Sequence, residues 1–288
     1  MKLFKKIILG SAILLSITII VYFVYFNLTQ DIVKPKDIEN SKNTELIQWN
    51  TRELFAVFVD PKDITIIDGI KIPLKGTFRL KPELTDTYAK IGVYDEKNKP
   101  LFIIPLFTAS AYSENGFYDF YNGNCNTCLT TKIRTVDELG EQSSANAVKI
   151  LELLGYDSIT DIELDKNPNI LLKYEKVIVL HSEYVTKSMF DVIISHPNVI
   201  YLYPNALYAE ITTNYEDDTI SLIRGHGYPE AEIDNGFDWE FDNTRPYEFD
   251  KKCDDWEFYD IPNGKMLNCY PEQKIWKDEK ILKVLKEL

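Results

Sequence analysis

Residues 174–211 read YEKVIVLHSEYVTKSMFDVIISHPNVIYLYPNALYAEI, and this stretch decides the fold. Two apolar runs, 176–180 and 198–203, are typical of strands buried on both faces of a parallel sheet. Between them, Thr186 can cap a helix that continues at helical spacing until His196-Pro197 ends it. Strand, helix and strand in this order predict an α/β layered sheet with parallel strands and right-handed crossovers.

The pattern extends towards the N-terminus. Ser143 and Ser144 can cap a helix that Gly155 ends, and a strand over 158–164 and a helical turn over 168–172 follow. Residues 53–106 are rich in β-branched and aromatic residues with turn signals between them, which predicts a largely antiparallel segment. Its expected strands are 54–59, 64–72, 77–80, 89–93 and 101–107. We expect 107–131, dense in Tyr, Phe, Asn and Gly, to be an ordered loop with buried aromatic rings.

The chain divides into five expected parts by composition. These are a transmembrane anchor (1–26), a tether (27–47), a β-rich segment (48–100), the α/β domain (101–223) and an acidic, aromatic-rich C-terminal extension (224–288). Within the extension, 237–242 alternates as a strand with one wet face does, and 273–288 predicts an amphipathic helix.

The N-terminus predicts a single membrane-spanning helix. Lys2, Lys5 and Lys6 precede an uncharged apolar run over 7–26, which as a helix would span roughly 30 Å. The positive-inside rule places the N-terminus in the cytoplasm and the main domain outside the cell membrane. A cleaved signal peptide and a buried core helix are the alternatives, but the long run with a bulky aromatic end favours an uncleaved anchor.

The charge of the chain argues against one class of partner. The formal net charge is −13, and three of the lysines precede the apolar run. The outer part is therefore more acidic still, which argues against nucleic-acid binding and against close docking on anionic lipid.

Four cysteines fit an oxidising location. Disulfides are the expected state, and local pairing of Cys125 with Cys128 and of Cys253 with Cys269 is the simplest connectivity. The spacing of the first pair also suits zinc, but that of the second pair does not. Free thiols are the third interpretation.

Polar side chains follow the two buried strands directly. Ligands bind beyond the carboxyl ends of parallel strands, and consecutive strands usually neighbour each other, so these two loops should face one water-filled crevice. They carry the residues His181, Glu183, Tyr184, Asn205, Tyr208 and, just beyond, Glu210. His181 or Glu183 could act as a general base, and several of these groups could bind a metal. For each residue alone, a structural role is the competing interpretation. His226 could reach the same crevice, although a plain turn is the simpler interpretation.

The stretch 174–211 resembles N,N-dimethylformamidase large-subunit-like domains. The shared pattern is a hydrophobic strand followed by His-x-Glu-Tyr, a helix, a second strand and Asn-x-x-Tyr. These domains belong to the class I glutamine amidotransferase-like superfamily, whose fold is flavodoxin-like. The turn in which that superfamily carries a nucleophilic cysteine holds Pro204-Asn205 here, which argues against cysteine-based acyl transfer.

The resemblance implies a hydrolase that acts on the C–N bond of a small amide, and the N-terminal anchor would place it on the extracytoplasmic side. It implies iron held by Tyr184 and Tyr208 with Glu183 or Glu210 as the carboxylate. His181 would then move protons and Asn205 would stabilise developing negative charge. The alternative from a different class is a non-catalytic cell-envelope protein whose crevice, together with loop 107–131, binds a ligand or another envelope protein.

Overall fold

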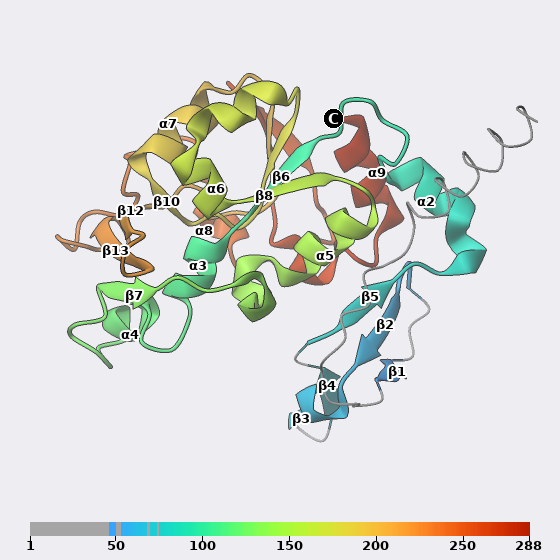
Figure 1. Cartoon of the computed structure of the whole chain (residues 1–288), viewed down its shortest axis with the longest axis horizontal. Helices are drawn as coiled ribbons and strands as arrows, with labels where there is room; N and C mark the ends of the chain where they lie inside the picture. The colour runs from blue at the N-terminus through green and yellow to red at the C-terminus, as the bar shows by residue number, and fades with distance from the viewer. Residues whose placement is uncertain (1–45, 50–52, 68–69, 74) are drawn as a thin grey trace, which may run out of the picture. The chain divides into compact units, whose positions relative to one another are not determined.

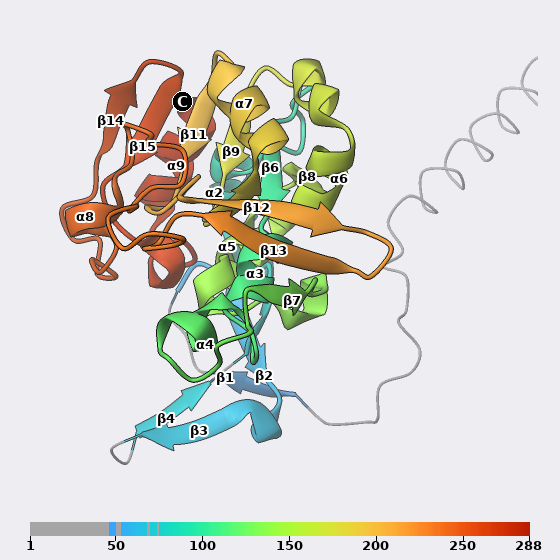
Figure 2. The same cartoon turned by 90° about the vertical axis from the view of Figure 1, so that its left-hand side faces the viewer.

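The centre of the protein is a mixed, mostly parallel β-sheet. The computed structural model describes residues 46–49, 53–67, 70–73 and 75–288. Among these residues the sheet has six strands in the order β14-β15-β11-β9-β6-β8, and every neighbouring pair is parallel except β14 and β15. The strands are β6 (Leu101–Ile104), β8 (Asp157–Thr160), β9 (Val177–Val179), β11 (Val199–Tyr201), β14 (Phe258–Ile261) and β15 (Gly264–Leu267). Figure 2 shows them from β14 on the left to β8 on the right.

Both faces of this sheet are covered. Successive strand residues point to opposite faces, so Val177 and Val179 join one hydrophobic cluster and Ile178 joins the other. On the Ile178 face lie the helices α2 (Thr85–Ile91), α5 (Ala145–Leu153) and α9 (Glu279–Glu287). On the Val177 face lie α6 (Asp161–Lys166) and α7 (Lys187–Ser195). The prediction of an α/β layered sheet with parallel strands is confirmed (Figure 1).

A second sheet adds to the Val177 face and carries loops of the candidate site. Its order is β10-β12-β13-β7, with β10 parallel to β12 and the other pairs antiparallel. The strands are β7 (Thr130–Lys132), β10 (Tyr184–Thr186), β12 (Ala209–Asn214) and β13 (Thr219–Arg224). The helices α3 (Leu106–Ala111), α4 (Phe117–Tyr121) and α8 (Thr244–Tyr247) complete this region.

The described part of the N-terminal β-rich segment is antiparallel, as predicted. It has a sheet in the order β1-β2-β5 and a separate hairpin of β3 and β4. The strands are β1 (Ile47–Trp49), β2 (Ala56–Val59), β3 (Ile64–Ile67), β4 (Ile70–Pro73) and β5 (Thr77–Arg79).

Five predicted strands differ from the structure. The strand expected over 64–72 is the hairpin of β3 and β4, and the strand expected over 101–107 ends at Ile104 because α3 begins at Leu106. Residues 89–93 were expected as a strand, but 85–91 form α2, which starts after Pro82 and buries Tyr88 and Ile91 one helical turn apart. The strand expected over 158–164 stops at Thr160, because Thr160 and Glu163 form a reciprocal capping box that begins α6.

The alternating run 237–242 contains no strand. The side-chain oxygen of Asn235 accepts the backbone N–H groups of Phe237 at 2.8 Å and Trp239 at 3.3 Å, which folds the segment into turns. Phe237 stacks on Phe190, and Trp239 packs against Tyr201. The alternation therefore reflects ring packing from a turn rather than strand pleating.

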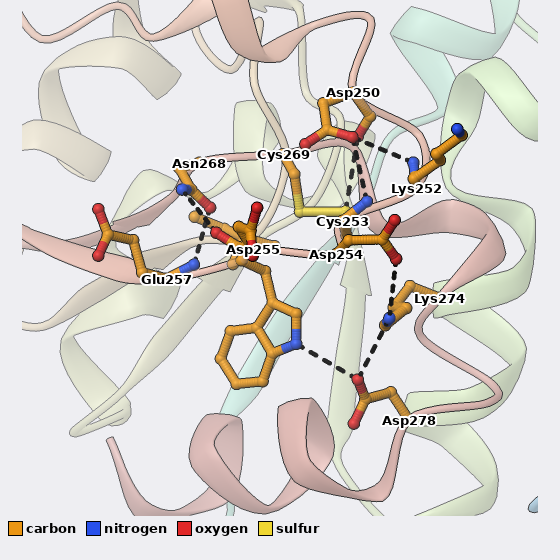
Figure 3. The surroundings of a disulfide bond; sticks show 12 residues. Asp250, Lys252, Cys253, Asp254, Asp255, Glu257, Asn268, Cys269, Lys274 and Asp278 are labelled. Carbon is orange, nitrogen blue, oxygen red and sulfur yellow. Dashed lines mark hydrogen bonds and ion pairs between the residues drawn. A yellow bond between two sulfur atoms is a disulfide. The ribbon is translucent and has the colours of Figure 1, made fainter.

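Both locally paired disulfides are present, as predicted, so the zinc and free-thiol interpretations are wrong for this oxidised structure. Cys125 is bonded to Cys128, and Cys253 is bonded to Cys269. Around the second disulfide, the carboxylate of Asp250 accepts the N–H of Cys253 at 3.1 Å (Figure 3). The loop predicted over 107–131 is ordered and contains α3, α4 and the start of β7.

The predicted membrane anchor and all but the end of the tether lie outside the described residues. Of the helices that the structure describes, none combines the length and the apolar character needed to cross a bilayer.

Candidate functional site

The candidate site lies where the order of the central strands reverses. The chain runs from β6 outward to β8, then returns to place β9 on the other side of β6. In open α/β sheets this switch point is where ligands bind. At this point the segment after β9 contacts the helix after β6. The N–H of Glu183 donates to the side-chain oxygen of Thr108, on α3, at 3.0 Å.

The two loops predicted to share the site, residues 181–184 after β9 and 204–208 after β11, do lie side by side. The N–H of Leu207 donates to the carbonyl of Ser182, and the N–H of Tyr208 donates to that of Glu183, both at 2.9 Å. The expected water-filled crevice is not open at these residues, however, since His181, Glu183 and Asn205 are all buried. Tyrosines from the segment 112–121 lie against them.

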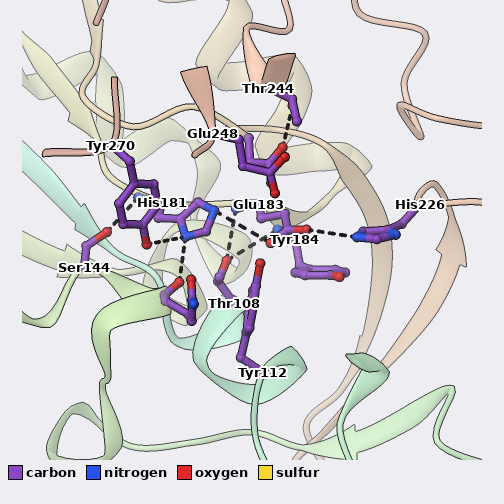
Figure 4. A network of polar contacts seen from close by, with 12 residues as sticks. Thr108, Tyr112, Ser144, His181, Glu183, Tyr184, His226, Thr244, Glu248 and Tyr270 are labelled. Atoms are coloured by element: carbon purple, nitrogen blue, oxygen red, sulfur yellow. Dashed lines mark hydrogen bonds and ion pairs between the residues drawn. The ribbon is translucent and has the colours of Figure 1, made fainter. Parts of the chain in front are cut away.

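Glu183 occupies the centre of the site. Its carboxylate lies between two imidazoles, with 3.7 Å from Oε2 to His181 Nε2 and 4.0 Å from Oε1 to His226 Nε2 (Figure 4). No part of Glu183 is exposed. Burial raises the pKa of its carboxyl to about 8, although hydrogen bonds from Tyr112 and Tyr118 oppose the shift.

Tyrosine hydroxyls approach this carboxylate from α4 and from the end of α3. The rings of Tyr112 and Tyr118 are stacked 3.9 Å apart, and their hydroxyls are 2.5 Å apart. Tyr118 donates to Glu183 Oε1 at 3.2 Å, and Tyr184 donates to Tyr121 at 3.4 Å. Burial raises the pKa of all four phenols. The many aromatic residues of 107–131 predicted buried rings in this segment. Their spacing did not identify Tyr118 as the residue that contacts Glu183.

His226 links the buried carboxylate to an open cavity. Its ring stacks on Tyr121 at 4.1 Å, and its Nε2 lies 3.3 Å from the Tyr118 hydroxyl. About a third of its side chain is exposed, at 32%. The flanking glycines, Gly225 and Gly227, both have positive φ and let the loop turn sharply here. The structure thus favours the site interpretation of His226 over the plain turn.

The cavity beside His226 has a volume of about 530 Å³. Its wall contains Asn205, Tyr208, His226, Gly227, Asp234, Thr244, Arg245, Glu248 and Phe249. The volume falls within the range of pockets that hold small organic ligands. Residues of the acidic C-terminal segment therefore complete a pocket that begins at the carboxyl end of the sheet.

His181 is held as a neutral imidazole on the opposite side of Glu183. Its Nδ1 lies 2.6 Å from the carbonyl of Gln142, and the hydroxyl of Tyr270 is 3.2 Å away. Burial lowers the pKa of His181 to about 4, more than the Gln142 carbonyl raises it. A proton on Nδ1 leaves the Nε2 lone pair facing Glu183. Buried atoms without a hydrogen-bond partner occur in three consecutive residues here: His181 Nε2, Ser182 Oγ and Glu183 Oε2.

The remaining predicted residues have different surroundings. Asn205 donates from Nδ2 to Glu248 Oε1 at 3.2 Å and accepts from the hydroxyl of Thr244. Tyr208 forms part of the cavity wall, with its ring edge-on to His226 at 5.7 Å. Glu210 lies on β12 opposite Val185, and its carboxylate makes no hydrogen bond or ion pair with the described residues. The structure therefore unites His181, Glu183 and Tyr184, leaves Asn205 and Tyr208 at the cavity, and adds Tyr118 and His226.

Three side-chain atoms that could bind a metal lie within 4.0 Å of one another. Within the described ranges, His, Cys, Asp and Glu side chains alone form no metal-binding group of three. With a phenol included, Tyr118 Oη, Glu183 Oε1 and His226 Nε2 form a triangle with sides of 3.2, 3.3 and 4.0 Å. The point equidistant from the three atoms lies about 2.1 Å from each, which is the usual length of a metal–nitrogen or metal–oxygen bond in proteins.

Two comparisons with known proteins find no match to the chain. No protein-family model matches the chain, and the search of curated proteins finds no similar sequence.

Proposed function

We propose that the protein is a metal-assisted hydrolase that cleaves the C–N bond of a small amide in the cavity beside His226. The triangle of Tyr118 Oη, Glu183 Oε1 and His226 Nε2 carries the proposal. Imidazole, carboxylate and phenol together suit iron, with zinc as the closest competitor. The sequence-based hypothesis had Tyr184 and Tyr208 as ligands, with Glu183 or Glu210 as the carboxylate. The proposed set keeps Glu183 and replaces the two tyrosines with Tyr118 and His226.

The order of the strands supports the proposed relationship to the amidotransferase-like superfamily. Numbered along the chain, the parallel strands β8, β6, β9, β11 and β15 lie in the order 2-1-3-4-5. That is the flavodoxin-like order, in which ligands bind between the first and third strands. The site described above lies at that position. Under the same proposal, residues 7–26 hold the domain on the outside of the cell membrane.

A bound metal would supply Lewis-acid polarisation of the amide carbonyl and a more acidic water molecule. The residues of the chain would do the remaining work. Tyr118, Glu183 and His226 would hold the ion, and the stacked Tyr112 would keep the Tyr118 hydroxyl in place through their 2.5 Å contact. The Nε2 of His181 has no hydrogen-bond partner and lies 3.7 Å from Glu183 Oε2, so His181 would take up the proton released during hydrolysis.

Cysteine chemistry is not available to this site in the oxidised protein. All four cysteines of the sequence are in disulfides, and none contacts Glu183. Acyl transfer through a cysteine nucleophile therefore does not compete with the proposed hydrolysis.

Elemental analysis of the purified protein tests the proposal. We expect about one iron or zinc per chain in the wild type, and loss of most of it in Glu183→Gln and His226→Gln. His196→Gln is the matched control, because His196 bonds to the carbonyl of Tyr174 at 3.0 Å and lies outside the site. Release of amine or ammonia from a panel of small amides should fall with the metal. Full metal in both variants would contradict the proposal.

One observation favours a second function, that of a non-catalytic ligand-binding protein. Glu183 has no exposed surface, and the tyrosines lie over it. A binding module would contain no metal, and its melting temperature would not change in chelator. A hydrolase of the proposed kind would lose stability in chelator because the metal binds only the folded chain.

A further inference from the structure

The cavity beside His226 carries side chains of both charges. Its wall includes the guanidinium of Arg245 and the carboxylates of Asp234 and Glu248. Among the residues that the structure describes, none forms an ion pair or a hydrogen bond with the Arg245 side chain. A cation that remains unpaired next to two carboxylates is free to bind an anionic group of a ligand.

The positions of two of these groups are set by the buried Asn205. Its carbonyl oxygen accepts from Thr244, where α8 begins, and its amide donates to Glu248, which follows that helix. Arg245 is the residue after Thr244, so Asn205 holds both sides of the turn that presents the guanidinium. Thr244 and Glu248 lie together beside Glu183 in Figure 4.

The third charged residue of the cavity, Asp234, lies next to His226 of the proposed metal site. The backbone carbonyl of Asp234 accepts the backbone N–H of His226 at 2.7 Å. Burial lowers the pKa of the His226 imidazole, and the charge of Asp234 acts to raise it by a smaller amount. The Asp234 side chain is exposed and forms part of the cavity wall. Negative charge therefore lies close to His226, and positive charge lies at Arg245 in the same cavity.

From these charges we propose that the ligand is a zwitterionic amide of dipeptide size. Its carboxylate would pair with Arg245, whose planar fork matches a carboxylate in two places. Its ammonium group would pair with Asp234 and Glu248. A dipeptide carries these two charges on either side of one amide bond, so binding both ends would hold that bond inside the cavity of about 530 Å³. This inference names the substrate class of the proposed hydrolase and rests on that function.

Calorimetric titration of the full-length protein with four forms of one ligand tests the inference. The probes are alanyl-alanine, its N-acetyl form, its C-terminal amide, and the form blocked at both ends. They share the central amide and differ in charge. We expect alanyl-alanine to bind at least about tenfold more tightly than either singly blocked form, with the doubly blocked form weakest.

Variants then attribute the preference to named groups. In Arg245→Gln, blocking the carboxylate of the ligand should no longer weaken binding, whereas blocking its amine should still weaken binding. Asp234→Asn combined with Glu248→Gln should do the reverse. Arg79→Gln is the matched control, because Arg79 lies on β5 with its guanidinium over the Phe58 ring, and blocking either end of the ligand should still weaken binding to it.

Two outcomes would overturn the inference: equal affinity for all four forms, or no binding of alanyl-alanine up to about 10 mM, a concentration well above a millimolar Kd. Metal analysis of the same samples separates this failure from that of the proposed function. If the protein contains metal but binds all four forms equally, the hydrolase proposal stands and the zwitterionic ligand is ruled out. Charge preference without metal supports zwitterion binding and removes the metal-assisted reaction.

Discussion

The hydroxyl of Tyr118 donates a hydrogen bond to Glu183 Oε1 at 3.2 Å, although 65 residues separate the two along the chain. Tyr118 comes from α4 and Glu183 from the loop between β9 and β10. His226, from a third segment, completes the contact at 3.3 Å from the same hydroxyl. The proposed chemistry depends on this meeting of three segments.

Replacing Tyr118 with phenylalanine should weaken metal binding by at least about tenfold. The change removes one of three donors and leaves the Tyr112 hydroxyl without its 2.5 Å partner. Tyr112 keeps its hydrogen bond to Glu183, so the loss of this one contact should lower the free energy of unfolding by about 1 kcal/mol. Metal content and urea denaturation measure the two effects. Tyr94→Phe, which removes a hydroxyl bonded to the carbonyl of Leu153 far from the site, should keep its metal.

The two glycines beside His226 should respond differently to alanine. A Cβ on Gly225 would lie 2.9 Å from the Ala209 Cα and 3.0 Å from the Tyr208 carbonyl, so the loop would have to move. A Cβ on Gly227 would meet nothing within 4 Å and would only strain a positive φ of 77°. We expect a loss of about 1 kcal/mol of unfolding free energy for Gly227→Ala and at least about 3 kcal/mol for Gly225→Ala. Metal retention by Gly225→Ala would argue against His226 as a ligand.

The two disulfides should contribute unequally to stability. Cys125–Cys128 closes a loop with a sequence separation of 3, and Cys253–Cys269 closes one of 16. The longer loop loses more entropy in the unfolded chain. Replacing each pair with serine should therefore cost about 2 kcal/mol for the first and about 3 kcal/mol for the second. Chemical denaturation of the two double variants measures the difference, and the reverse order would show that packing around the sulfurs dominates.

Buried Glu272 should make the protein less stable as the pH rises. Burial raises the pKa of Glu272 to about 8, more than its hydrogen bonds from Tyr203 and the N–H of Asn146 lower it. Between about pH 4.5 and 8 the folded chain therefore keeps a proton that the unfolded chain has released. The stabilising contribution of protonated Glu272 is complete below about pH 4.5. It decreases as the pH rises to about 8, by up to about 1.4 kcal/mol per pH unit.

Glu272→Gln should flatten the pH dependence of unfolding over this window, as followed by denaturation at several pH values. The exposed Glu257→Gln is the control and should leave the slope unchanged. An unchanged slope in Glu272→Gln would show that this carboxyl is already ionised in the folded protein.

Local sequence predicted the elements whose signals lie within a few residues. The runs around Val177 and Val199 formed buried parallel strands, and the side chain of Thr186 caps α7 by accepting the N–H of Met189 at 3.3 Å. Such signals act over one turn of helix or one strand, so one segment suffices to recognise them. The adjacency of the loops after β9 and β11 followed from the rule that consecutive strands neighbour each other.

Only the tertiary structure decided which side chains face Glu183. Tyr118 and His226 carry no local mark that distinguishes them from the other tyrosines of 107–131 or from an ordinary Gly-His-Gly turn. Phe237 and Trp239 alternate like strand residues because they pack on rings from α7 and β11, not because they pair with a neighbouring strand. The chain by itself determined where its elements begin and end wherever capping and periodicity are local. The composition of the site depended on contacts such as Tyr118–Glu183 and Tyr118–His226, which span 65 and 108 residues. Such contacts are set by the packing of both sheets and not by any short-range pattern.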